Sequence, residues 1–194
     1  MTLARYLSYY YGSFIPAYAD AVATLGDKPA QLLVEQENTL AHLLAFLKNN
    51  DDTDNLKKAY GHLERATLDC YKIIWVTNKE KLSYYIRLDN SNLALAFNAS
   101  ESEVMQKIRQ IDSLAKEARE LEARGIGQNS SKALEKYIQV VALERELLDS
   151  ADIKKASSYN KFKISHLLKD HAIGFATGIA AGVATTILYE FFTK

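Results

Sequence analysis

The chain is poor in the residues that interrupt or cross-link a fold, with one cysteine, two prolines and eight glycines among 194 residues. A single thiol, that of Cys70, excludes an internal disulfide and a zinc site built from several thiolates, and it fits a reducing compartment. Few prolines and glycines leave few points at which a helix must stop. Basic and acidic residues both number 24, so the net charge by itself points neither to nucleic acid nor to a membrane surface.

Signatures of several enzyme classes are also missing. No histidine follows an arginine at the spacing of HEPN ribonucleases, and the Glu-x-x-His pairs of di-iron bundles do not occur. His-Glu-x-x-His, the P-loop and Gly-x-Ser-x-Gly are absent as well. Cys70 falls on the apolar side of a predicted helix, which favours a buried, unreactive thiol. We therefore expect no enzymatic activity, no metal and no cofactor.

Apolar residues recur at spacings of three and four along most of the chain, which predicts an all-α fold, a bundle of about six helices. Pro16 and Pro29 stand where helices could begin. A long helix is expected from about Thr53 to Leu88. The expected apolar stripes are Leu3, Leu7, Tyr10 and Phe14; then Leu32, Leu33, Leu40, Leu43, Leu44 and Leu47; then Tyr60, Leu63, Ala66, Cys70, Ile73 and Ile74.

Two later stripes predict a long αα-hairpin. Ser100 and Glu103 form a capping box, in which each side chain satisfies a free N–H group at a helix start. A short loop, 125–131, separates the two stripes, so their helices should pack antiparallel. The stripes are Val104, Ile108, Ile111, Ala115 and Ala118, followed by Leu134, Tyr137, Ile138, Val141 and Leu148.

The segment from Ala172 to Tyr189 contains no charged residue. As a helix its eighteen residues would span roughly 27 Å, close to the ~30 Å hydrocarbon core of a bilayer. Lysines before it and aromatic residues at its far end are typical of membrane interfaces, and the positive-inside rule places the N-terminal domain in the cytoplasm. The lysines are Lys154, Lys155, Lys161, Lys163 and Lys169, and the aromatic residues are Tyr189, Phe191 and Phe192.

These features predict a single-pass protein of the inner (cell) membrane with a C-terminal transmembrane helix. Residues 1–151 would form a cytoplasmic helical domain for sensing and oligomerisation. Residues 152–171 would form a basic juxtamembrane helix, and 172–194 a transmembrane or conditionally inserting tail. Because eight of the eighteen uncharged residues are alanine or glycine, the tail is only modestly hydrophobic. Storage of the tail within a resting oligomer, with insertion on activation, is therefore an open alternative.

Small residues recur every four positions in this tail. On a helix they would form two narrow faces, and such faces let helix backbones approach closely in lipid. A single anchor has no need of two faces, whereas a ring of tails would use both, so we expect a homo-oligomer. The residues are Gly174, Gly178 and Gly182 on one face, and Ala176, Ala180 and Ala184 on the other.

A charged stripe runs along the predicted helix 53–88. Lys58, His62, Arg65, Asp69 and Lys72 follow one another at spacings of four and three, so they share one helix face. One interpretation is a site for an anionic ligand, with a bidentate contact from the arginine, added charge from the lysines, the aspartate orienting the arginine, and the histidine donating or accepting. The other is an ordinary solvated surface.

The stretch from Gly61 to Trp75 contains the pattern His-Leu-x-Arg-Ala-x-x-Asp-x-x-Lys. Over about fifteen residues it resembles a pattern of small helical proteins of bacterial membrane-effector systems. Together with the glycine-rich tail, the chain resembles the membrane effector of two-gene anti-phage defence systems of the CBASS and Hailong types. The resemblance implies that the helical domain senses DNA or a nucleotide. The signal would be a nucleotide or oligonucleotide that a partner nucleotidyltransferase makes. It also implies that the tail permeabilises the membrane.

The leading hypothesis is therefore a non-enzymatic membrane effector, a pore-forming homo-oligomer gated by an anionic ligand. A second is a tail-anchored adaptor, which tethers a helical protein-interaction domain to the inner membrane. A third is a soluble sensor in which the C-terminal helix belongs to the core.

Overall fold

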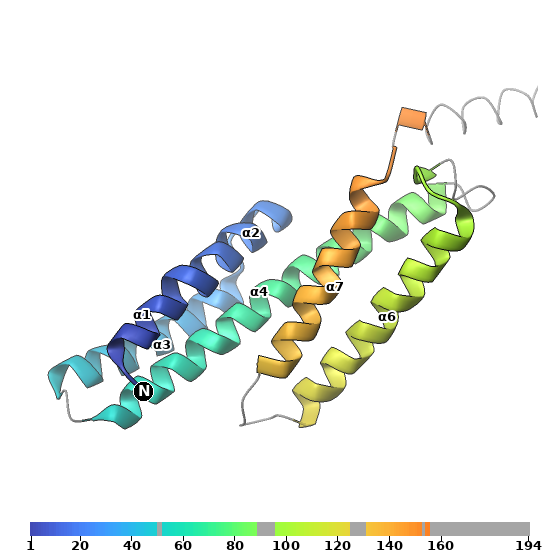
Figure 1. The fold of residues 1–194 in the computed structure, drawn as a ribbon. Helices are drawn as coiled ribbons and strands as arrows, with labels where there is room; N and C mark the ends of the chain where they lie inside the picture. Colours follow the sequence, from blue (N-terminus) through green and yellow to red (C-terminus); the bar gives the residue numbers. More distant parts are fainter. Residues whose placement is uncertain (50–51, 89–95, 125–130, 153, 156–194) are drawn as a thin grey trace, which may run out of the picture.

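The computed structural model describes residues 1–49, 52–88, 96–124, 131–152 and 154–155 (Figure 1). These residues confirm the all-α fold, since their regular structure is helical apart from one isolated β-bridge. No helix within the described ranges has the length and apolar character to span a bilayer. The predicted tail, 172–194, lies outside the described residues. The helices are α1 (Leu3–Tyr9), η1 (Tyr10–Phe14), α2 (Ile15–Leu25), α3 (Ala30–Lys48), α4 (Thr53–Leu88), α6 (Glu101–Arg124) and α7 (Ser131–Asp149).

The first three helices form one continuous rod. Thr2 caps its start by accepting a hydrogen bond from the Arg5 N–H, and Gly26, at a φ of 81°, ends it. Between α1 and α2 the backbone widens into the π-helical turn η1, where the N–H of Ile15 bonds the carbonyl of Tyr10. Pro16 lies in the first turn of α2, as expected, although α2 continues the rod directly from this turn. A proline ring clashes with the carbonyl four residues earlier, and a π turn relieves that clash.

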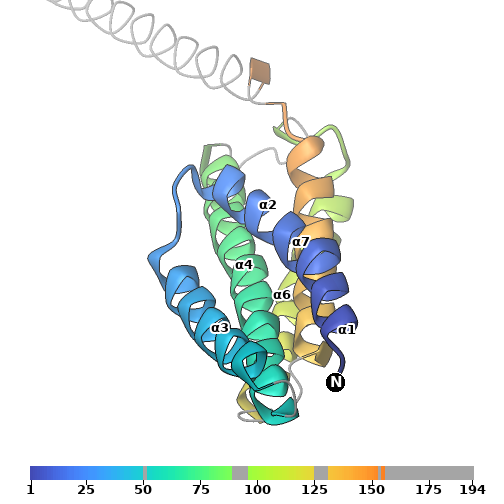
Figure 2. The ribbon, with the colours of Figure 1, turned by 90° about the vertical axis from the view of Figure 1, so that its left-hand side faces the viewer.

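Helix α4 is the centre of the structure. Its bounds agree with the predicted helix 53–88, and Asp52 caps it by accepting a hydrogen bond from the Asn55 N–H. The rod, α3 and α7 all pack on α4, as Figures 1 and 2 show. Its buried residues therefore point in several directions: Leu56, Ala59, Leu63, Ala66, Leu68, Cys70, Ile74, Trp75 and Leu82.

The predicted hairpin of α6 and α7 is confirmed. Ser100 and Glu103 make the reciprocal capping hydrogen bonds at the start of α6. Ion pairs between Lys107 and Glu146, and between Lys136 and Glu117, join opposite ends of the two helices and fix them antiparallel. At the open end of the hairpin, an isolated β-bridge between Phe97 and Ala151 ties the chain entering α6 to the chain leaving α7.

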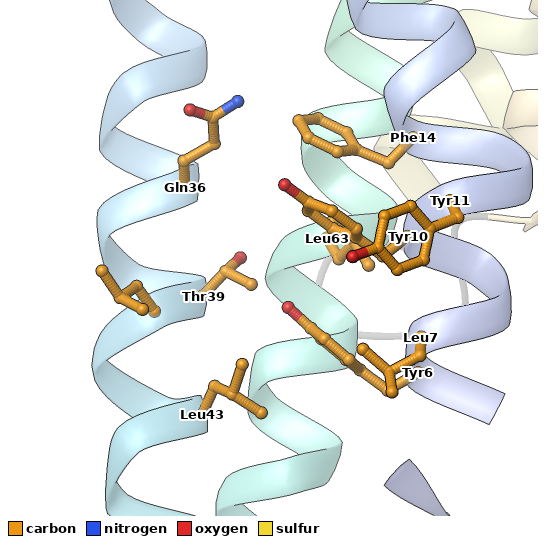
Figure 3. A pocket seen from close by; sticks show the side chains of 10 residues that line it. Tyr6, Leu7, Tyr10, Tyr11, Phe14, Gln36, Thr39, Leu43 and Leu63 are labelled. Atoms are coloured by element: carbon orange, nitrogen blue, oxygen red, sulfur yellow. The ribbon is translucent and has the colours of Figure 1, made fainter. Parts of the chain in front are cut away.

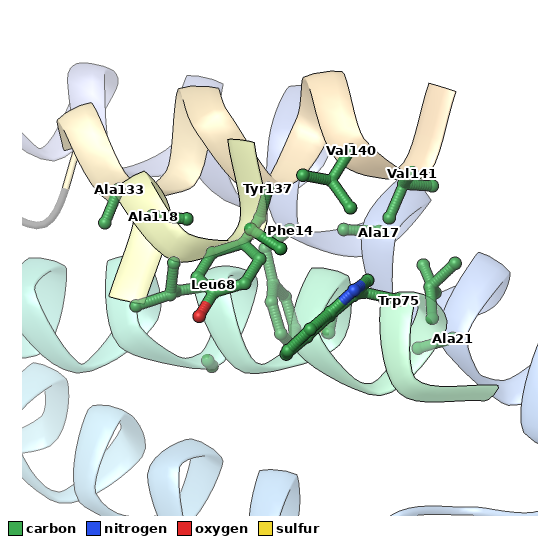
Figure 4. Close-up of a cluster of buried hydrophobic side chains, with 14 of the residues drawn as sticks. Phe14, Ala17, Ala21, Leu68, Trp75, Ala118, Ala133, Tyr137, Val140 and Val141 are labelled. Carbon is green, nitrogen blue, oxygen red and sulfur yellow. The ribbon is translucent and has the colours of Figure 1, made fainter. Parts of the chain in front are cut away.

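Aromatic rings of η1, α4 and α7 lie together in the core (Figure 4). Trp75 of α4 lies against Tyr137 of α7, with ring centroids 5.6 Å apart. Phe14 of η1 is 1% exposed and enters the same cluster. Alanines at Ala17 and Ala21 let the rod approach this region closely, which explains why α2 contributes small residues to the core.

The apolar stripe expected on α3 is not buried as a whole, which corrects the sequence interpretation. Within it Leu32 is buried, but four leucines are between 44% and 56% exposed: Leu33, Leu40, Leu44 and Leu47. Leu7 of the first stripe and Ile138 of the α7 stripe are also exposed, at 41% and 40%. Among the described helices α3 packs closely on α4 alone. One helix neighbour covers one face, so the other apolar face of α3 stays open.

A buried carboxyl group interrupts the core between α4 and α7. Glu144 is fully buried, and neither its carboxyl oxygens nor the side-chain nitrogen of Asn78 has a hydrogen-bond partner among the described residues. Burial raises the pKa of Glu144 to about 8, although Asn78 and Lys79 favour the ionised form; Asp112 raises it further. The folded chain therefore keeps this carboxyl protonated at neutral pH.

We expect Glu144→Gln to stabilise the fold at alkaline pH. In the unfolded chain the carboxyl ionises near its ordinary pKa of 4.5, so unfolding releases a proton between about pH 4.5 and pH 8. The free energy of unfolding then falls as the pH rises through that window. Urea unfolding followed by circular dichroism should show a gain on the order of 2–4 kcal/mol at pH 8 and little gain at pH 5. Glu135→Gln, on the exposed face of α7, is the control; an equal gain at both pH values would contradict this account.

Candidate functional site

The charged stripe of α4 lies along the seam between α3 and α4 and is divided into two groups by its contacts. His62 faces α3, where its Nδ1 lies 2.7 Å from a carboxylate oxygen of Glu35. Asp69 and Lys72 contact each other at 3.4 Å farther along the helix. The remaining two cations, Lys58 and Arg65, are exposed.

The first group is a pair of histidines at the α3–α4 seam. His42 of α3 and His62 of α4 lie nearly parallel, with ring centroids 5.3 Å apart. Each ring bonds a residue of the opposite helix, His42 to Asn55 and His62 to Glu35, both at 2.7 Å. In each helix the histidine stands seven residues after the partner that bonds the other ring. Each helix therefore supplies one histidine and one hydrogen-bond partner, and the two hydrogen bonds that join α3 to α4 are related by an approximate two-fold symmetry.

The hydrogen bonds fix which ring nitrogen carries the proton. Asn55 donates through its side-chain nitrogen to Asp52, so its oxygen is left to accept from His42 Nδ1. A carboxylate only accepts, so His62 Nδ1 must donate to Glu35. The Nε2 atom of each neutral ring is then an acceptor, and it becomes a donor to an anion only when the ring is protonated. A phosphate oxygen is therefore bonded at Nε2 only by a ring that carries both protons.

The second group is a network of opposite charges. Lys72 bonds Glu122 of α6 at 2.8 Å, and Glu122 also accepts a hydrogen bond from Tyr137. Burial lowers the pKa of Lys72, but the hydrogen bond to Glu122 and the charge of Asp69 outweigh it and raise the pKa above its ordinary value. Lys72 is therefore charged and already neutralised by two carboxylates.

Asp69 is the second member of this network. Burial raises its pKa, against the effect of Lys72. Its carboxylate accepts from Gln31 of α3 and contacts Lys72, in place of the expected Arg65. Asp69 and Lys72 line a cavity of about 280 Å³ whose other walls are mainly apolar, among them Leu25 and Val76.

The exposed cationic surface of the stripe is therefore smaller than the spacing of its five residues suggested. Lys58 and Arg65 point outward on either side of His62, and Arg65 makes no ion pair with any residue in the described ranges. Sequence reasoning missed the residues that complete these two groups: Gln31, Glu35 and His42 of α3, Asn55 of α4 and Glu122 of α6. The matching seven-residue spacings of Glu35 to His42 and of Asn55 to His62 were a usable signal. No comparable spacing indicated Gln31 or Glu122.

Separate from this surface, an apolar groove lies between the rod and α3 (Figure 3). Its cavity measures about 290 Å³, and Leu63 of α4 forms its floor. The rod contributes aromatic rings and a leucine, and α3 contributes two leucines with two small polar side chains. The walls are Tyr6, Leu7, Tyr10, Tyr11 and Phe14 on one side, and Gln36, Thr39, Leu40 and Leu43 on the other.

The N-terminal tyrosines differ in burial. Tyr6 is 3% exposed, whereas Tyr11 is 68% exposed at the groove. Cys70 is buried as predicted, and burial raises the pKa of its thiol to about 12, so it is a poor nucleophile. Within the described ranges, no three His, Cys, Asp or Glu side chains are grouped so as to hold a metal ion. The small-residue positions Gly174–Ala184 lie outside those ranges.

Lys72 and Arg65 should differ in their effect on stability. Removing the Lys72 charge in Lys72→Met leaves Asp69 and Glu122 close together without their shared cation, and should lower the free energy of unfolding by about 1–2 kcal/mol. Arg65→Ala removes an exposed side chain and should change it by less than about 0.5 kcal/mol. Urea unfolding measures both; equal losses would show that Arg65 has a structural role.

Comparison of the chain with protein-family models, with curated proteins and with solved structures gave no match.

Proposed function

We propose that this chain is a membrane effector, in which the helical domain oligomerises and senses an anionic nucleotide or oligonucleotide while the C-terminal helices permeabilise the membrane. One observation carries the proposal: an uncharged stretch, Ala172–Tyr189, with two small-residue faces, follows a lysine-rich segment at the end of a helical bundle. Small faces of this kind favour the packing of copies in lipid. The proposed protein is single-pass in the inner membrane, with residues 1–151 in the cytoplasm.

The proposed ligand surface is the exposed part of the α4 stripe. Lys58 and Arg65 flank His62, and phosphate groups are recognised by such charge-assisted hydrogen bonds. Of the five stripe residues, Asp69 and Lys72 serve the ligand indirectly, because their network holds α4 against α3 and α6. By its resemblance to two-gene defence systems, the chain would receive its ligand from a partner nucleotidyltransferase.

The position of this surface suggests how binding is transmitted. A phosphate that bonds Nε2 of a protonated His62 shares the charge of that ring with Glu35, which accepts from Nδ1 and through which α3 holds the ring. Glu35 lies on α3, whose only close helix neighbour in the described ranges is α4. The anion therefore acts at the contact that sets the position of α3.

Gly178→Leu should abolish permeabilisation. A large side chain on the glycine face separates the tails by preventing close backbone approach. Cells expressing the full-length variant should retain potassium, whereas cells expressing the wild type should lose it, and the circular dichroism of the purified variant should remain helical. Ile179→Leu, the next residue, is the matched control and should leak like the wild type. Leakage from the Gly178→Leu variant at the wild-type rate would refute the pore.

Arg65→Ala should weaken ligand binding without loss of stability. Loss of a charge-assisted contact worth about 1.5–3 kcal/mol predicts a roughly tenfold or larger rise in Kd for a fluorescein-labelled single-stranded DNA oligonucleotide, measured by fluorescence anisotropy. Arg87→Ala removes another exposed arginine of the same helix and should leave Kd unchanged. Equal affinities of all three proteins would remove Arg65 from the site.

The exposed apolar face of α3 also fits the adaptor hypothesis, because contiguous exposed apolar surface marks protein-interaction sites. An adaptor needs only tethering. Replacement of 172–194 by an unrelated hydrophobic helix would restore the activity of an adaptor and would leave an effector inactive.

A further inference from the structure

The groove between the rod and α3 has the form of a helix-binding site. The backbones of its two walls do not pack closely on each other, since α3 packs closely on α4 alone and the rod packs elsewhere on α4. Figure 3 shows Thr39 and Leu43 facing Tyr6, Tyr10 and Phe14 across the opening. A hydrophobic groove of this kind, between two helices and above a third, receives the apolar face of a further helix.

The exposed apolar residues continue along both rims of the groove. On α3, Leu33, Leu40, Leu44 and Leu47 recur at spacings of seven, four and three, which places them on one face. On the rod, Leu7, Tyr11 and Ile15 recur every four residues and are between 38% and 68% exposed. Scattered apolar residues need no explanation, but two facing stripes along one groove form a continuous surface.

The chemistry of the groove selects an uncharged occupant. None of its ten lining residues is charged, and the hydroxyl of Thr39 already bonds the Glu35 carbonyl. A helix with a charged face would desolvate that charge against rings and leucines without a partner. The ring-lined wall also favours small residues, which let a helix lie close to bulky side chains.

One segment of this chain has those properties. Residues 172–189 carry no charge, and eight of them are alanine or glycine. A helix of this segment would present large apolar side chains beside the small ones. The large residues are Ile173, Phe175, Ile179, Val183, Ile187 and Leu188.

The intervening chain is long enough for this segment to reach the groove. Glu144 of α7 lies beside Asn78 of α4, which places the end of α7, Asp149, level with about residue 83 of α4. Leu63, the floor of the groove, is then about 30 Å away along α4. The sixteen residues 156–171 cover up to about 53 Å when extended.

We propose that the groove between α1–η1 and α3 is the resting site of the chain's own C-terminal segment 172–189. This inference rests on the proposed membrane function, to which it adds a stored state: the apolar segment is covered by the groove before it enters the bilayer. Glu35 and the groove wall belong to the same helix, α3, so an anion bound to His62, the ring that holds Glu35, acts on one wall of the storage site.

Cysteine cross-linking of the full-length chain tests the stored state. Leu40→Cys on the groove wall is combined with Ala180→Cys in the tail, and intact cells are treated with a short bismaleimide. Native Cys70 is buried with a raised pKa and does not react. We expect an intrachain cross-link, identified by peptide mass, at a yield several times that of the control pair Ile138→Cys with Ala180→Cys. Ile138 is an exposed apolar residue of α7, away from the groove.

Two results would overturn the proposal. A yield equal to that of the Ile138→Cys control would show that the segment does not occupy the groove. A product that joins two chains only would assign the groove to another copy. Leakage of potassium from the same cells reports the membrane function separately. Cross-linking without leakage under any condition would contradict the pore hypothesis and support the docking of the segment in the groove. Leakage without cross-linking would support the pore hypothesis and contradict the docking.

Discussion

The described structure depends on the burial of α4 from several directions at once. This helix of 36 residues packs against the rod, α3 and α7, so its apolar residues cannot be confined to one stripe. Leu63 faces the groove between the rod and α3, while Trp75 lies against Tyr137 of α7. Each neighbour covers only part of α4, and the rod, α3 and α7 are held mainly through it, whereas α6 packs on α7. A ligand or charge change along α4 therefore acts on contacts to more than one helix.

Different polar side chains of α4 contact different neighbouring helices. The crossed bonds of His42 and His62 fasten α3 at one level, and Asp69 fastens it again through Gln31. Lys72 fastens α6 through Glu122. Since these side chains are already engaged, the exposed positive charge of the stripe is reduced to Lys58 and Arg65. A site that is partly structural in this way couples binding to helix position, because an anion bound to His62 acts on a ring that also holds α3.

The sequence was a good guide wherever a local rule determines the structure. Helix spacing predicted α4 from Thr53 to Leu88, and the reciprocal bonds of Ser100 and Glu103 follow from their spacing alone. It failed where burial depends on a neighbour: Leu40 and Leu44 have the periodicity of core residues but lie exposed. Periodicity shows that a face is apolar, and not what covers it. In the same way, the stripe on α4 was visible in the sequence, whereas Glu35 and Glu122 pair with it only through the fold.

The groove that the described helices leave between the rod and α3 and the uncharged segment 172–189 complement each other. Together they describe an effector that keeps its membrane segment covered until a ligand binds. The most direct test of the central claim compares purified full-length protein with a chain truncated after Lys169, added to dye-filled vesicles. With the single-stranded DNA oligonucleotide present, the account predicts that the full-length protein releases dye, and that the truncated chain keeps the helical circular dichroism of the bundle and releases none. A full-length protein that stays inert with the oligonucleotide, or a truncated chain that unfolds, would contradict it.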